Sequence, residues 1–261
     1  MWLAYHDVYR TEPARGIPRS AGMYHVSKQA FLRHMSAIRE AGRPVVAISE
    51  YLAGVAADSL VLTFDDGWSG AFENALPFLK EAGWKATFFV TRDFVGRDRF
   101  CNKGMLVDAV EAGMEIGVHG TTHRMLSRCS GAELAWEFAA CKNYLESLLG
   151  RAVQHASLPG GDWSPEVEAC ARQAGFKSVC TSVPGFNILD ASPFQLKRMA
   201  IKSGTQCSDI DRYCEYSCDR EIWRRAFLQV PRRILGVRNY VRVRRWIVDE
   251  RSDSQPALFE P

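Results

Sequence analysis

Short hydrophobic runs alternate with longer amphipathic patterns along most of the chain. The runs are rich in aliphatic and aromatic residues and have the length of buried strands: residues 2–6, 45–48, 60–64, 86–91, 115–118, 177–181 and 196–201. Strands that alternate with helices in this way are typical of βα units built around a parallel sheet. The pattern therefore predicts an α/β fold with a parallel sheet or barrel.

Two of the intervening segments carry clear helix signals. The first helix is expected after Ser27, which can cap it, and Gly42 with Pro44 should end it. Its hydrophobic positions recur at helical spacing: Phe31, Met35 and Ile38. A longer helix should follow Ser130 and end at Gly150. Its hydrophobic stripe comprises Leu134, Phe138, Cys141, Leu145 and Leu148. Such stripes are expected to pack in the core rather than to bind a cofactor.

Composition fits a folded domain of this size. The 261 residues are 47% hydrophobic and 24% charged, which is ordinary for a chain with a large core. No linker rich in proline, glycine or serine divides it. We therefore predict one domain over residues 1–210, followed by a C-terminal appendage over residues 211–261.

Charge, cysteine content and the N-terminal residues bear on the partners and the cellular compartment of the protein. A formal net charge of +3 is too small to indicate nucleic acid as a partner. The eight cysteines form no CxxC pair, as expected for thiols in a reducing compartment. The chain begins without the pattern of a secretory signal, and no apolar run approaches the about 18 residues of a membrane span. These features predict a cytoplasmic protein.

Two polar sites follow two of the predicted strands. Asp65, Asp66 and Gly67 come directly after residues 60–64. Catalytic side chains in barrels lie where strands end, although Asp-Gly is also an ordinary turn. His119 and His123 follow residues 115–118 at a spacing of four, which lets both imidazoles face one cation. Two histidines and a carboxylate would leave coordination positions open for water and substrate.

The two motifs together resemble those of a known family. TFDDG followed by H-x-x-x-H is similar to the NodB-type polysaccharide deacetylases, carbohydrate esterase family 4, and the resemblance extends over about residues 1–205. It implies an irregular (β/α) barrel of about seven strands and one divalent metal, usually Zn²⁺. It also implies that Asp66, His119 and His123 bind the metal, and that Asp65 is the general base.

The implied reaction is removal of an N-acetyl group from an amino sugar, in the biosynthesis of a cell-surface polysaccharide or a lipid-linked glycan. An amine leaving group needs a proton donor, usually a histidine, but the late strand at residues 196–201 contains none. His6 ends the first strand and resembles the acid of the permuted subgroup that acts on poly-N-acetylglucosamine. We assign His6 as the general acid, with a hydrogen-bonded core histidine as the alternative. His25 and His34 look like surface positions, and His155 carries no motif.

A third family motif is incomplete. Ser157 stands where the family has an arginine that orients the catalytic aspartate. Either another cation replaces that arginine, or the orientation and pKa of Asp65 are set in another way. The backbone of Pro159, Gly160 and Gly161 is expected to border the substrate pocket. Trp163 either stacks on a sugar ring or packs in the core.

The C-terminal appendage is basic and aromatic. Residues 222–248 contain eight arginines and no acidic residue, interleaved with large apolar side chains. This composition suits peripheral contact with the inner face of an anionic membrane or with phosphate groups, and it also suits a helix packed on the barrel with its charges in solvent. Nucleic acid is not expected as a partner.

Two other functions remain compatible with these motifs. A deformylase or other amide hydrolase acting on a lipid-linked sugar would use the same metal site with a different acyl pocket. A catalytically silent glycan-binding partner would fit the missing arginine and the missing late histidine. A glycosidase fits poorly, because its two carboxylates flank the scissile bond whereas Asp65 and Asp66 are adjacent.

Overall fold

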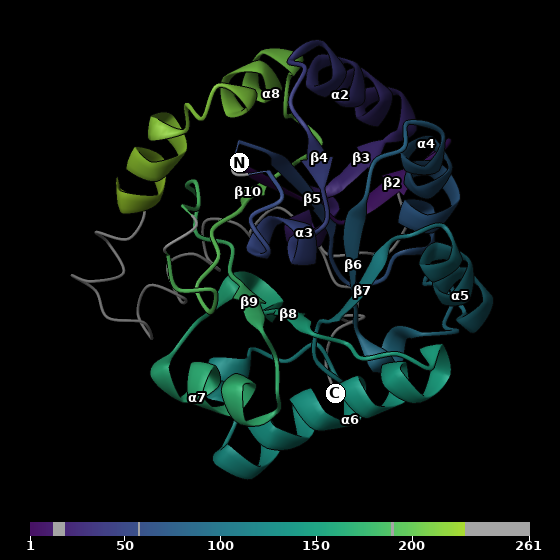
Figure 1. Ribbon diagram of the computed structural model, residues 1–261, viewed down its shortest axis with the longest axis vertical. Coiled ribbons are helices and arrows are strands. Elements are labelled where there is room, and N and C mark those ends of the chain that lie inside the picture. The colour runs from purple at the N-terminus through teal and green to yellow at the C-terminus, as the bar shows by residue number, and fades with distance from the viewer. Residues whose placement is uncertain (13–18, 57, 189–190, 228–261) are drawn as a thin grey trace.

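The computed structural model describes residues 1–12, 19–56, 58–188 and 191–227 (Figure 1). Its main sheet has eight strands, and all of its strand pairs are parallel. The strands run in the order β10 (Met199–Ala200), β1 (Trp2–Tyr5), β5 (Leu60–Phe64), β6 (Ala86–Val90), β7 (Glu115–Val118), β8 (His155–Ser157) and β9 (Ser178–Cys180), with β4 (Val45–Val46) beside β5. The sheet curls, which confirms the predicted irregular (β/α) barrel.

Helices cover the outer face of the curled sheet (Figure 1). They are α2 (Lys28–Glu40), α4 (Leu76–Glu81), α5 (Lys103–Glu111), α6 (Gly131–Leu149), α7 (Pro165–Gln173) and α8 (Cys207–Cys214). Two short helices, α1 (Arg19–Gly22) and α3 (Ile48–Leu52), lie in connections between strands. Because the strands are covered on both faces, they read as unbroken apolar runs. In β5 all five residues are buried.

The helix signals of the sequence lie where they were expected. Ser27 caps α2 by accepting a hydrogen bond from the Ala30 amide, and Ser130 caps α6 through the Glu133 amide. Gly150 ends α6 in a left-handed conformation, with φ of 63°. Both predicted helices are confirmed, because local capping and hydrophobic spacing specify the same ends.

The helix α3 closes the amino-terminal end of the barrel, and Figure 1 shows it across the middle of the ring. The Ser49 amide donates to Glu115 Oε1 at 3.2 Å, and Ser49 Oγ lies 2.8 Å from His155 Nε2. Glu115 and His155 begin β7 and β8. The carboxyl ends of the strands therefore open on the opposite side, where loops carry the chemistry.

A small second sheet extends the barrel near its first strand. Here β2 (Asp7–Tyr9) pairs in parallel with β3 (His25–Ser27), so that Asp7 lies opposite His25. The sequence reading did not anticipate either strand. Both are three residues long, too short for a recognisable alternation of polar and apolar positions.

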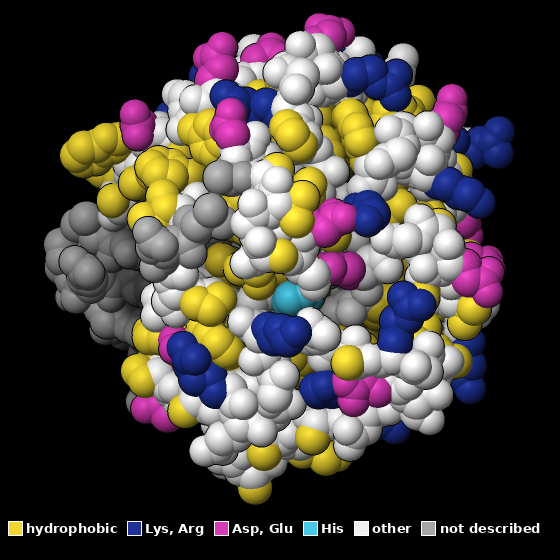
Figure 2. Space-filling model, in the orientation of Figure 1, with side chains coloured by type: hydrophobic (Ala, Val, Ile, Leu, Met, Phe, Trp, Pro, Cys, Tyr) yellow, Lys and Arg dark blue, Asp and Glu magenta, His cyan; other side chains and the backbone are white. Residues whose placement is uncertain are grey.

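The described part of the C-terminal appendage packs on the barrel. The helix α8 contacts α2 and buries Ile210, Tyr213 and Cys214. Residues 219–227 are helical, and Trp223 and Phe227 are 75% and 77% exposed. Figure 2 shows hydrophobic side chains gathered over this segment, beside the grey atoms. Most of the basic segment 222–248 lies outside the described residues. Among the residues that the structure describes, no helix is both long and apolar enough to cross a membrane.

Candidate active site

Two loops at the carboxyl ends of β5 and β7 bring the polar motif residues together. Asp65 and Asp66 follow β5, and His119 and His123 follow β7, with β6 between the two strands. Asp66 and His123 have left-handed backbones, with φ of 73° and 65°. Such conformations are uncommon outside glycine and cluster at functional sites.

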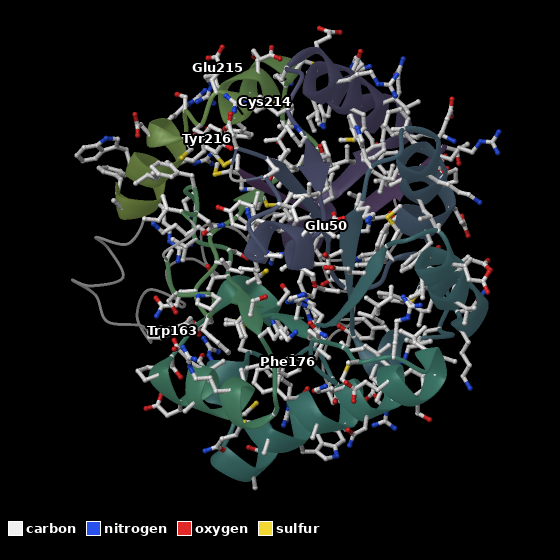
Figure 3. The ribbon with its side chains drawn as sticks, viewed as in Figure 1. Glu50, Trp163, Phe176, Cys214, Glu215 and Tyr216 are labelled. Atoms are coloured by element: carbon white, nitrogen blue, oxygen red, sulfur yellow. The ribbon has the colours of Figure 1, made fainter. Side chains whose placement is uncertain are left out.

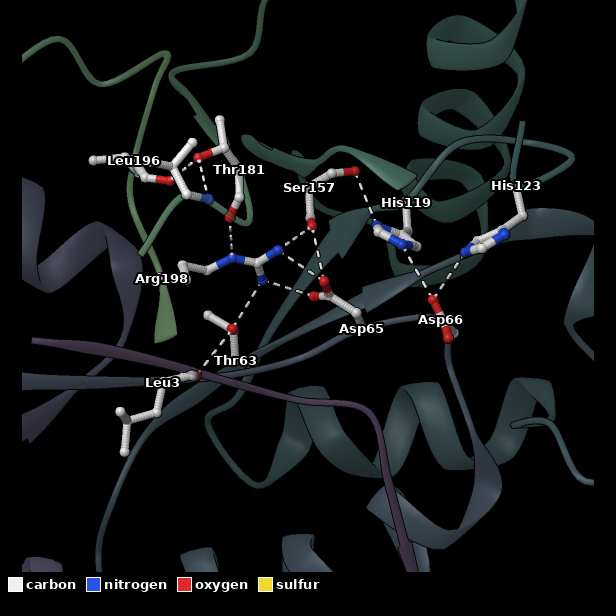
Figure 4. Close-up of polar contacts among 11 residues, drawn as sticks. Leu3, Thr63, Asp65, Asp66, His119, His123, Ser157, Thr181, Leu196 and Arg198 are labelled. Carbon is white, nitrogen blue, oxygen red and sulfur yellow. Dashed lines mark hydrogen bonds and ion pairs between the residues drawn. The ribbon is translucent and has the colours of Figure 1, made fainter. Parts of the chain in front are cut away.

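Asp66, His119 and His123 converge on one point (Figure 4). Asp66 Oδ1 lies 3.1 Å from Nε2 of each histidine, and one donor atom from each residue lies within 4.8 Å of the others. His119 Nδ1 lies 2.9 Å from the Ser157 carbonyl oxygen, a contact that fixes the proton on Nδ1 and leaves the Nε2 lone pair for a ligand. Two imidazoles and a carboxylate form an established set for a divalent cation such as zinc. These residues fit the expected metal.

Electrostatics at this cluster favour a carboxylate between two imidazoles. Burial alone would raise the pKa of Asp66, but the charge of His123 and the hydrogen bonds of His119 and His123 outweigh it and hold the pKa well below 3.8. Burial would lower the pKa of His123, and the Asp66 carboxylate outweighs this, so the pKa is raised above 6.5. A cation would replace the proton that otherwise joins these groups.

Asp65 belongs to a separate buried network (Figure 4). Arg198, next to β10, donates to both oxygens of Asp65 at 2.8 Å, and Ser157 Oγ donates to Asp65 Oδ2 at 3.1 Å. Burial would raise the pKa of Asp65, but the Arg198 guanidinium outweighs it and lowers the pKa below 3.8. Asp65 is therefore an ionised, oriented acceptor.

Arg198 is the cation that replaces the motif arginine, which the sequence analysis left unidentified. It lies within residues 196–201, a strand in which only the missing histidine was noted. The guanidinium is 0% exposed and also donates to Ser157 Oγ at 2.7 Å. An arginine within a mainly apolar strand was the available signal, because a buried arginine needs an anionic partner.

Glu137 on α6 supports the loop that carries the histidines. Its Oε2 accepts hydrogen bonds from the amides of Thr121 and Thr122, at 2.6 Å and 2.9 Å, and its Oε1 accepts from the Thr122 hydroxyl. Glu137 is 1% exposed. A buried carboxylate with three donors from one loop orders the residues between the two histidines.

Comparison with known proteins points to one family. A family model described as polysaccharide deacetylase matches residues 54–179. The chain is therefore similar to this family over about half of its length. A Bacillus subtilis protein named as a polysaccharide deacetylase, YxkH, is 24% identical over 219 residues, which cover 82% of this chain and 75% of that protein.

Another relative and a solved structure are also similar to this chain. The chitooligosaccharide deacetylase of Bradyrhizobium sp. (strain ANU 289) is 32% identical over 127 residues, which cover 48% of this chain and 56% of that protein. The structure of the Streptococcus pyogenes deacetylase PplD in complex with acetate has a TM-score of 0.71 at 19% identity, covering 80% of this chain and 95% of that one. This last likeness concerns the fold.

The cluster of Asp66, His119 and His123 lies in a cleft of about 350 Å³, within the usual range for small-molecule sites. His6 lines it together with the four motif residues. Its ring stacks on Tyr24, with centroids 4.6 Å apart. Burial lowers the pKa of His6 below 6.5, although the Asp66 and Asp65 carboxylates oppose the shift. The general-acid assignment stays a prediction.

The remaining predicted positions divide between the cleft and the core. Gly160 lines the cleft, whereas Pro159 and Gly161 are buried in a short 3₁₀ turn. Trp163 packs against the core beside α7 (Figure 3), so a sugar contact there stays a prediction. The prediction that His25 and His34 are surface positions is wrong, because each is 2% exposed. His34 Nδ1 lies 3.2 Å from the Tyr5 hydroxyl oxygen, and His25 Nδ1 lies 2.8 Å from Asp7 Oδ2.

Proposed function

We propose that this protein is a metal-dependent N-deacetylase that releases acetate from N-acetylglucosamine residues of a glycan. The observation that carries the proposal is the convergence of Asp66, His119 and His123 beside the oriented Asp65 carboxylate. Similarity to the polysaccharide deacetylase family supports the reaction class, and the named chitooligosaccharide deacetylase supports an amino-sugar polymer as substrate.

The metal proposal rests on the three convergent donor atoms. Asp66 Oδ1 and the two Nε2 atoms would hold one divalent cation, most plausibly Zn²⁺, on one side. A cation bound there would lower the pKa of a coordinated water to about 7 and polarise the amide carbonyl. The Ser157 carbonyl keeps His119 in the tautomer that binding requires.

Asp65 is proposed as the general base. Arg198 occupies one acceptor position on each oxygen, and Ser157 occupies a second on Oδ2. Oδ1 therefore keeps a free lone pair that can take a proton from the attacking water. The same arginine lowers the pKa of Asp65, which keeps the carboxylate ionised and ready to accept.

His6 is proposed as the general acid. Cleavage of the C–N bond needs a proton delivered to nitrogen, because an amide anion is a poor leaving group at neutral pH. His6 lines the same cleft as Asp65 and Asp66, and the charges of both carboxylates favour the protonated form of its ring. Its place directly after β1 also supports a resemblance to the permuted subgroup.

Membrane contact is proposed through the basic C-terminal segment. In its described portion Trp223 and Phe227 are exposed one helical turn apart, with Arg224 between them. Aromatic and arginine side chains in this arrangement suit an anionic lipid surface. The protein would then bind a lipid-linked or polymeric glycan at the membrane surface. The cytoplasmic location stays a prediction.

Acetate release tests the proposed function. The zinc-loaded protein is incubated with nucleotide-linked, lipid-linked and oligomeric N-acetylglucosamine, and acetate is measured enzymatically. We expect release from the oligomer or the lipid-linked sugar that stops when a chelator removes the metal. Release of formate from the N-formyl analogues with none of acetate would favour the deformylase, and release of neither would refute catalysis.

A further inference from the structure

A second buried pair of polar side chains lies on the wall of the cleft. His25 Nδ1 lies 2.8 Å from Asp7 Oδ2, and the two side chains are 1% and 8% exposed. The pair joins β2 and β3, whose register places Asp7 directly opposite His25. The deacetylation chemistry described above uses neither residue.

Packing holds this pair in one orientation. The His25 ring meets Trp68 edge to face, with centroids 4.6 Å apart and planes at 73°. Trp68 is fixed in turn by its hydrogen bond of 2.9 Å to Asp66 Oδ2. On the other side Asp7 packs against Gly70, where an added Cβ would collide with Asp7 Oδ1. The pair is thus a rigid element tied to the metal-ligand loop.

The second ring nitrogen of His25 is open to the cleft. Asp7 occupies Nδ1, and Nε2 makes no hydrogen bond within residues 1–12, 19–56, 58–188 and 191–227. His25 lines the cleft beside Tyr24 and Trp68. Nε2 can therefore form a hydrogen bond with a group that enters the cleft.

The chemistry of the pair defines that partner. Asp7 holds the proton on Nδ1, so Nε2 accepts a hydrogen bond when the ring is neutral and donates one when the ring is charged. A hydroxyl group can do both. Tyr24 also lines the cleft next to His25, and aromatic side chains are usual neighbours of a sugar ring that also presents hydroxyls.

We propose that His25 binds a hydroxyl group of the sugar whose acetamido group is hydrolysed, and that Asp7 is its positioning residue. This inference rests on the proposed function. With the acetamido group at Asp66, the other substituents of the same sugar lie against the cleft wall. The pair thereby selects a hydroxylated ring in one orientation.

Two isosteric substitutions separate binding from a structural role. In His25→Asn the amide nitrogen replaces Nδ1, so the contact with Asp7 is kept and the cleft-facing nitrogen is lost. In His25→Gln the amide replaces Nε2, so the cleft-facing group is kept and Asp7 loses its partner. A purely structural pair would be damaged more by His25→Gln, because a buried carboxylate is left unpaired.

The affinity for tri-N-acetylchitotriose is measured by calorimetry in chelator, so that no turnover occurs, and folding is followed by thermal denaturation. We expect His25→Asn to weaken binding about 5- to 10-fold, the worth of one hydrogen bond. His25→Gln should bind within about 2-fold of wild type while melting at a lower temperature. Wild-type affinity in His25→Asn, or equal losses in both variants, would overturn the assignment.

Deoxy sugars identify the bound hydroxyl and separate this inference from the proposed function. The methyl glycosides of N-acetylglucosamine lacking the 3-, 4- or 6-hydroxyl are tested against wild type and His25→Asn. One of them should lose affinity for wild type but not for His25→Asn, and loss in both proteins for every analogue overturns the inference. If wild type neither binds the trimer nor releases acetate, the proposed substrate itself is wrong.

Discussion

Arg198 holds Asp65 through two parallel hydrogen bonds, from Nη1 to Oδ1 and from Nη2 to Oδ2, each 2.8 Å long. The side chains are 0% and 4% exposed. A bidentate pair fixes the direction of a carboxylate as well as its charge. The position that holds an arginine in the family motif is occupied by Ser157, which supplies a hydroxyl to the same carboxylate. The cation therefore reaches Asp65 from the strand on the opposite edge of the sheet.

Arg198→Lys should lower kcat by about 10- to 100-fold while the protein stays folded, because a lysine keeps the charge but cannot form the paired hydrogen bonds. Acetate release and circular dichroism are measured together. Arg172→Lys is the matched control, since Arg172 forms a surface ion pair with Glu168 and its side chain is 52% exposed. Activity of Arg198→Lys equal to that control would remove the orienting role.

Moving the arginine back to the motif position gives a stricter test of the same contact. Arg198→Ser should be nearly inactive, because Asp65 loses its cation. The double variant Ser157→Arg, Arg198→Ser exchanges the two partners of Asp65 and should recover about 10-fold in kcat over Arg198→Ser. No recovery in a double variant that folds would show that the direction of approach matters as much as the charge.

Asp65→Asn should lower turnover by about 10²-fold or more, the usual effect of losing a general base, and should leave metal content unchanged. The amide keeps the shape of the side chain but takes up no proton. Asp66→Asn is the paired variant and should lose the metal. If zinc analysis shows the opposite pattern, the roles of the two aspartates are exchanged.

His6→Ala should slow hydrolysis of an acetamido sugar by about 10²-fold or more but barely slow an activated aryl acetate ester. A phenolate leaves without protonation, whereas an amine does not. Metal content should stay at the wild-type level, since His6 is not proposed as a ligand. Equal losses on both substrates would assign His6 a structural role.

Stability should fall in acid because of His155, which is 3% exposed at the closed end of the barrel. Burial lowers the pKa of His155 from 6.5 to about 4. The unfolded imidazole therefore binds a proton as pH falls through 6.5, while the folded one does so only near 4, so stability is lost between these values. Over that range the loss approaches about 3 kcal/mol.

The matched variant for this pH effect is His155→Gln, whose amide can still reach Ser49. The free energy of unfolding is measured with urea from about pH 4.5 to 7.5. Wild type should lose more stability than His155→Gln toward the acid end. Parallel curves for the two proteins would show that His155 carries a proton in the folded state.

The sequence predicts the barrel and its metal cluster because both depend on short, local patterns. Unbroken apolar runs specify strands covered on both faces, and β5 and β7 each end in their own motif. Parallel strands bring such ends to one rim without further information. Spacing and strand ends therefore group the two histidines with the Asp65–Asp66 pair, and the family resemblance singles out Asp66 as the ligand.

What the sequence did not reveal depends on contacts between distant segments. Asp65 and Arg198 are separated by 133 positions, and Asp7 meets His25 only because two three-residue strands pair. Neither contact follows from periodicity or a local motif. His25 looked like a surface residue because one polar side chain before a helix gives no sign of burial. The β8 strand at His155 was missed because its polar residues bond across the barrel base.

The most direct test of the central claim is the zinc content of the purified protein, measured by mass spectrometry alongside acetate release. Wild type should bind one zinc per chain, and the double variant His119→Ala, His123→Ala should bind none and release no acetate while its circular dichroism stays that of the wild type. Full zinc occupancy in the double variant, or acetate release without metal, would contradict the account.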